Sequence, residues 1–106
     1  MRQTNRDLRH YYRVANKLYF YNALPDDLPV RFGNLPPGVL GRTWVRGGVA
    51  EHMVISKRLQ TLMCPTLMTL LHECLHVEKP KYVGHGWQFD KRMLRLAQAG
   101  AFYGTW

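Results

Sequence analysis

The sequence predicts a single α+β domain over residues 1–106, with an N-terminal helix, a small three-stranded sheet and two further helices. Three observations predict this class. Apolar residues recur at helical spacing near both ends of the chain and around residues 65–77. Short runs rich in Val, Ile, Trp and Phe, separated by glycine and proline, fill residues 30–56. A chain of 106 residues leaves room for one hydrophobic core.

The first helix is expected over residues 4–22. Thr4 or Asn5 can cap its first turn. The prolines and aspartates of Leu24–Pro29 favour turns and stop the helix. Its apolar residues fall at helical spacing, at Leu8, Tyr11, Tyr12, Ala15, Leu18 and Tyr19.

Three strands are expected next, over residues 29–33, 39–46 and 50–56. Gly47-Gly48 between the last two is typical of a tight hairpin. A second helix is expected from Pro65 to Val77, because proline suits the first helical turn and Lys79-Pro80 stops the helix. A third helix follows Gly84-His85-Gly86 and ends near Gly100.

Composition excludes several classes of protein. Residues 1–7 contain no apolar signal segment, and no apolar run approaches the ~18 residues of a membrane span. Two cysteines, Cys64 and Cys74, are too few for a disulfide scaffold or a zinc ribbon. We therefore expect a cytoplasmic protein that makes no membrane contact. Fifteen Lys and Arg against seven Asp and Glu give a net charge of +8, which by itself favours nucleic acid, a phospholipid surface or an acidic protein as a partner.

The helix expected over residues 65–77 contains His72-Glu73-Cys74-Leu75-His76, a match to the pattern H-E-x-x-H. Histidines four positions apart lie about 40° apart around a helix axis, so both imidazoles can reach one metal ion. Glu73 stands beside them and can accept a proton from a Zn²⁺-bound water, whose pKa the metal lowers. The pattern predicts a zinc site with Glu73 as general base.

The apolar side of this helix is expected to lie away from the two histidines. Cys74 falls on that side, which predicts a buried apolar residue rather than a metal ligand. At about 100° per residue, the core side gathers Leu67, Leu70, Leu71, Cys74 and Leu75.

A catalytic zinc usually has three protein ligands and one open position, so a third ligand is expected. His85 is the favoured candidate, because the flanking Gly84 and Gly86 let the backbone approach a crowded centre. Asp90, within the last helix, is the alternative ligand, although the favoured roles for it are acceptor of an imidazole N–H or plain surface charge.

Four segments together resemble one known family. The H-E-x-x-H pattern followed by His85-Gly86-Trp87-Gln88-Phe89 is similar to the SprT-like zinc metallopeptidases, whose third zinc ligand is the histidine of an H-G-x-x-F segment. Tyr19–Pro25 resembles that family's aromatic-Asn-x-x-Leu-Pro helix ending, and Gly41-Arg42-Thr43 resembles the Ala-Gly-Arg of its second strand. The similarity spans about residues 8–96.

The resemblance implies a minimal zincin-like metallopeptidase domain over residues 1–106, without the C-terminal zinc ribbon of many members. It implies that His72, His76 and His85 hold one Zn²⁺ per chain and that Glu73 activates the zinc-bound water, which hydrolyses peptide bonds. The expected partner is a protein or peptide substrate. Because the family includes proteases that degrade protein trapped on DNA, DNA-associated proteins are candidate substrates.

Basic residues on the first helix carry a second expectation. They recur at spacings of three and four, so they project from one side of the helix and could follow the phosphates of a nucleic acid. A solvated outer face is the plain alternative for such a run. The residues are Arg2, Arg6, Arg9, Arg13 and Lys17.

The competing hypothesis is a nucleic-acid-binding module whose zinc is structural and which cuts no peptide. The two hypotheses differ at Glu73, which would coordinate nothing in a structural site. A closed site also needs a fourth protein ligand, and the sequence offers no evident one.

Overall fold

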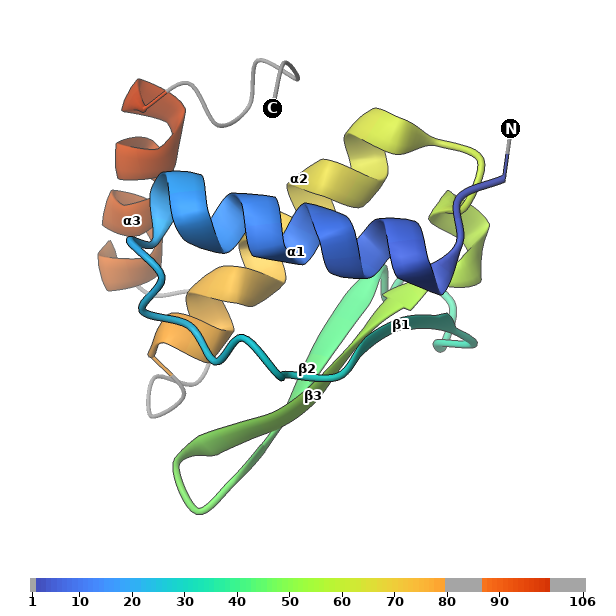
Figure 1. Ribbon diagram of the computed structural model, residues 1–106, viewed down its shortest axis with the longest axis horizontal. Coiled ribbons are helices and arrows are strands. Elements are labelled where there is room, and N and C mark those ends of the chain that lie inside the picture. Colours follow the sequence, from blue (N-terminus) through green and yellow to red (C-terminus); the bar gives the residue numbers. More distant parts are fainter. Residues whose placement is uncertain (1, 80–86, 100–106) are drawn as a thin grey trace.

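The computed structural model describes residues 2–79 and 87–99. For residues 87–90 it describes the backbone and not the side chains. Over the described residues it has the expected α+β class, with three α-helices and one three-stranded sheet (Figure 1). The elements, in chain order, are α1 Asn5–Tyr19, β1 Val30–Gly33, β2 Gly41–Arg46, β3 Val49–Ser56, the 3₁₀ turn η1 Lys57–Leu59, α2 Met63–Glu78 and α3 Trp87–Gln98.

The sheet has β3 at its centre. β1 pairs with it in parallel and β2 pairs antiparallel on the other side, which leaves β2 at an edge. The β2–β3 hairpin turns at Gly47-Gly48, as expected, and both glycines have positive φ. β2 begins at Gly41, two residues later than expected, because Val39 N–H donates to Pro36 C=O in a turn before the strand.

Two helices, α1 and α2, contact each other and pack on the sheet, and the tip of the β2–β3 hairpin extends beyond them (Figure 1). The core between these layers is apolar and fully buried. It includes Leu8 and Tyr12 of α1, Met53 and Ile55 of β3, and Leu70 of α2. This core fixes the height of α2 above the sheet, and so sets which side chains of β2 reach it.

Thr4 is the residue that caps α1, through a capping box with Asp7. The helix ends at Tyr19, three residues earlier than expected, because Tyr21 and Asn22 adopt positive φ. Asn16 is buried and exchanges two hydrogen bonds with the backbone of Leu24, which holds the chain after the helix. The expected apolar stripe is wrong at Leu18, which is 51% exposed.

Helix α2 begins at Met63, two residues before the expected start. The Thr66 hydroxyl hydrogen-bonds to the Leu59 and Leu62 carbonyls and ties this first turn to η1. The expected core side is confirmed, because Leu67, Leu70, Leu71, Cys74 and Leu75 are all buried.

Two ion pairs join α3 to the end of α2. Arg92 and Arg95 lie 3.7 and 3.4 Å from the Glu78 carboxylate, and Leu96 of α3 is buried in the core. None of the helices in the described part of the chain is both long and apolar enough to cross a membrane.

Candidate metal centre

The centre of the site is one side of α2, where His72 and His76 follow each other by one turn. Their imidazole rings lie 5.2 Å apart between centroids, edge to face. Both residues are half-buried. One ligand atom from each of His72, Glu73 and His76 can be chosen so that all three lie within 4.8 Å of one another. Within the described residues, this group could hold a metal ion.

The donor set fits zinc. Imidazole nitrogens and carboxylate oxygens are ordinary zinc ligands, and a tetrahedral zinc keeps its ligand atoms about 3.4 Å apart. The ligand atoms here are at most 4.8 Å apart, so small side-chain rotations on a fixed backbone would bring them to that spacing. Burial is intermediate at both histidines, which leaves room for a further ligand from solvent or substrate.

Glu73 is buried, with only 5% of its surface exposed. The Thr43 hydroxyl of β2 donates a hydrogen bond of 2.9 Å to Glu73 Oε1, while Oε2 lies 3.9 Å from His72 Nε2. Burial raises the pKa of the Glu73 carboxyl above its ordinary value, and the Thr43 hydrogen bond opposes this by lowering it. The carboxyl is therefore oriented at one oxygen and faces the histidines with the other.

Gly41 allows β2 to approach α2 at this point. A Cβ there would lie 2.7 Å from Thr69 Cγ2 and 3.0 Å from Glu73 Cγ, both too close for a side chain. The approach brings the next inward residue of the strand, Thr43, within hydrogen-bond distance of Glu73. Glycine at 41 and threonine at 43 thus hold the carboxyl between strand and helix.

A pocket of about 350 Å³ adjoins the site. His72 and Glu73 form part of its wall, so it opens onto the same groups that could hold the metal. The remaining lining residues are Gly38, Leu40, Gly41, Met68, Thr69 and Met93.

The other predicted residues have different outcomes. His85 and the side chain of Asp90 lie outside the described residues. Cys74 is fully buried, as expected, and burial raises the pKa of its thiol. Cys64 is exposed.

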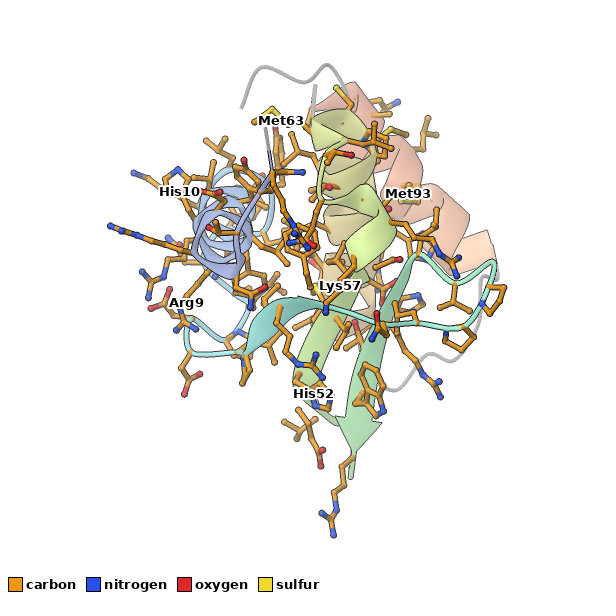
Figure 2. The ribbon with its side chains drawn as sticks, turned by 90° about the vertical axis from the view of Figure 1, so that its right-hand side faces the viewer. Arg9, His10, His52, Lys57, Met63 and Met93 are labelled. Atoms are coloured by element: carbon orange, nitrogen blue, oxygen red, sulfur yellow. The ribbon has the colours of Figure 1, made fainter. Side chains whose placement is uncertain are left out.

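Four of the predicted basic residues lie on α1, whereas Arg2 precedes the helix, which begins at Asn5. Figure 2 shows Arg9 and its neighbour His10 pointing away from α2. Arg9 is half-buried, Arg13 lies 3.8 Å from Asp26, and Arg2 donates to the Gln60 side chain. The exposed members are Arg2, Arg6, Arg13 and Lys17.

Sequence reasoning missed a second cluster, on the sheet face away from α2. Because Thr43 points to α2, its neighbours Arg42 and Trp44 point to the opposite face. Trp44 stacks on His52 of β3, with 4.4 Å between ring centroids. The Arg42 guanidinium lies 5.1 Å from the Trp44 ring centroid, a cation–π distance. We call Arg42, Trp44 and His52 the hairpin stack.

Thr43 and Gly41 were also missed as site residues. Neither forms a spaced pattern with Glu73, which is thirty positions from Thr43 and thirty-two from Gly41, and their only signal was the Gly41-Arg42-Thr43 segment that carries the family resemblance. Their role follows from the contact between β2 and α2.

The chain matches no protein-family model, no curated protein and no solved structure among those compared with it.

Proposed function

We propose that this chain is a zinc-dependent endopeptidase with a zincin-like fold of the SprT-like type. One observation carries the proposal: a buried carboxyl, Glu73, is held by Thr43 beside two histidines one helical turn apart. One oxygen of this buried carboxyl accepts a hydrogen bond from the neighbouring strand, and the other lies toward His72.

In this proposal His72, His76 and His85 would hold the zinc, leaving a fourth position for water or substrate. When bound, zinc polarises a substrate carbonyl and makes water a nucleophile at neutral pH. The assignment of His85 has its own test, which is the zinc content of His85→Ala. Loss of zinc supports the third ligand, and full zinc content contradicts it.

Glu73 would act as the general base. Its Oε1 accepts the Thr43 hydrogen bond, so Oε2, on the side of His72, is the oxygen that takes the proton from water and returns it to the leaving amine. Glu73 could instead be a metal ligand, since its oxygens lie within the same 4.8 Å group. Glu73→Gln distinguishes the two roles. Zinc binding is kept if Glu73 is the general base and is lost if Glu73 is a ligand.

The peptide would bind along β2. Within the described residues this strand pairs with β3 alone and forms an edge of the sheet, and it begins at Gly41, beside the pocket and Glu73. An extended peptide can add to such an edge through backbone hydrogen bonds. That arrangement recognises the backbone of an unfolded segment more than any one side chain.

The deciding experiment compares wild type with Glu73→Gln on an unfolded protein substrate, with zinc measured on the same samples. Cleavage lost with zinc retained supports the general base. Loss of both would make Glu73 a ligand, and no cleavage by the zinc-loaded wild type would contradict the peptidase. Glu51→Gln is the matched control, because Glu51 lies on the exposed hairpin and pairs with Arg46.

A second candidate is a nucleic-acid-binding module, and the hairpin stack favours it. Arg42, Trp44 and His52 offer stacked planar groups, and bases stack on indole, imidazole and guanidinium planes. Arg31 of β1 and Arg42 of β2 flank Val54 on this face, and both are exposed. With the basic side of α1, these groups would attract phosphates. If both candidates hold, the substrates would be proteins associated with DNA.

A further inference from the structure

We infer that the pocket beside His72 and Glu73 receives one large apolar side chain of the substrate, so that cleavage falls next to residues such as leucine, methionine or phenylalanine. The inference rests on the proposed peptidase function. It adds a preference to a site whose backbone recognition along β2 would by itself be indifferent to sequence.

Among the described residues, the pocket wall is apolar apart from Thr69 and the site residues themselves. Leu40 is 46% exposed and Met68 is 51% exposed, and both line the pocket together with Met93 of α3. Apolar side chains gathered this way at the mouth of a polar site favour a ligand that covers them. No lysine, arginine or aspartate is among the lining residues described.

The pocket is also placed where a side chain beside the cleaved bond would reach. Met68 and Thr69 lie one helical turn before His72 and Glu73 on α2, a rise of about 5.4 Å. Consecutive Cα atoms of a peptide are about 3.8 Å apart. A side chain next to a carbonyl held near His72 is therefore within reach of Met68.

Size and chemistry narrow the occupant. A volume of about 350 Å³ is near the lower end of small-ligand pockets, so even the largest apolar side chains fit. Methionine walls are flexible and adapt to differently shaped apolar groups. An acidic side chain would bring a like charge to Glu73 in a partly dry pocket, which disfavours it.

The direct test is binding of small hydroxamates by the zinc-loaded full chain. The probes carry the same zinc-binding group and a leucyl, phenylalanyl, glycyl or aspartyl side chain, and calorimetry measures their affinities. Burying a leucine-sized side chain predicts about 10- to 150-fold tighter binding of the leucyl than of the glycyl compound. The aspartyl compound should bind no better than the glycyl one.

Two variants localise the effect. Met68→Glu should abolish the leucyl preference, because it places a charge in the wall. Met63→Glu is the control on the same helix, since Met63 is 54% exposed, does not line the pocket and lies apart from Met93 (Figure 2). Met68→Leu should keep the preference.

Equal affinity for leucyl and glycyl hydroxamates, a preference that survives Met68→Glu, or no binding at all would overturn the inference. Cleavage assays on the same samples separate it from the proposed function. Cleavage without any side-chain preference would contradict the apolar-pocket inference and support the proposed peptidase function. A leucyl preference in binding without cleavage of any protein would support the apolar pocket and contradict the peptidase function.

Discussion

Replacing Thr43 with valine tests whether β2 holds the Glu73 carboxyl in place. The change removes one hydroxyl and keeps a branched side chain of similar volume. In the structure that hydroxyl lies 2.9 Å from Glu73 Oε1 and 3.5 Å from the Glu73 backbone oxygen. Because Glu73 is 5% exposed, solvent has little access to replace the lost donor.

The expected cost follows from that burial. Hydrogen bonds to charged groups contribute about 1.5–3 kcal/mol, more than the 0.5–1.5 kcal/mol of neutral ones. Thr43→Val should therefore lower the free energy of unfolding by about 1.5–3 kcal/mol, which is about 10- to 150-fold in the folding equilibrium. Small domains have about 5–15 kcal/mol in total, so the variant should still fold.

Urea unfolding at neutral pH measures this cost as a lower midpoint with an unchanged slope. Thr43→Ser keeps the hydroxyl and is the control. In a Glu73→Gln background the charge is gone, so the same substitution should cost only about 0.5–1.5 kcal/mol. Peptide cleavage should fall in Thr43→Val with zinc content unchanged. A midpoint and a cleavage rate equal to those of wild type would refute the positioning role.

Further predictions concern the packing of β2, the fixing of α1 and the binding of nucleic acid. Gly41→Ala should lower stability by about 1–3 kcal/mol through overpacking against α2, and unchanged urea unfolding would contradict it. Tyr12→Phe removes a 2.6 Å hydrogen bond to the Pro25 carbonyl and should cost about 0.5–1.5 kcal/mol in thermal unfolding; an unchanged melting temperature would speak against it. Trp44→Ala should weaken single-stranded DNA binding about 5- to 150-fold if one base stacks there. Equal affinities of wild type and Trp44→Ala in a titration would show that the hairpin stack does not contact the DNA. Arg6→Gln should reduce the slope of log affinity against log salt concentration by about 0.7. An unaltered slope would show that Arg6 makes no phosphate contact.

Much of the fold could be predicted because its signals are local. The capping residue Thr4, the Gly47-Gly48 turn and the apolar period of α2 each act within a few residues, and each is confirmed. The end of α1 could not be predicted, because it depends on the buried Asn16 side chain bonding to Leu24, eight residues further on. Helical spacing alone therefore extended the helix too far.

For the site, too, residues close together in the sequence could be predicted and residues brought in from another element could not. His72, Glu73 and His76 could be identified from spacing, since one helical turn brings them together. Thr43 could not, because its contact with Glu73 depends on how β2 packs against α2. His52 forms no spaced pattern with other histidines in the sequence, and it is the hairpin register that places it across from Trp44.

In the proposed metal centre His72 and His76 together hold a zinc ion. The most direct measurement is the zinc content per chain of purified protein that has been stripped with chelator, reloaded and desalted. We predict about one zinc per chain for wild type and for His10→Ala, an exposed histidine on α1, and close to none for His76→Ala. Equal zinc in His76→Ala and wild type, or a wild type that retains no zinc, would contradict the account.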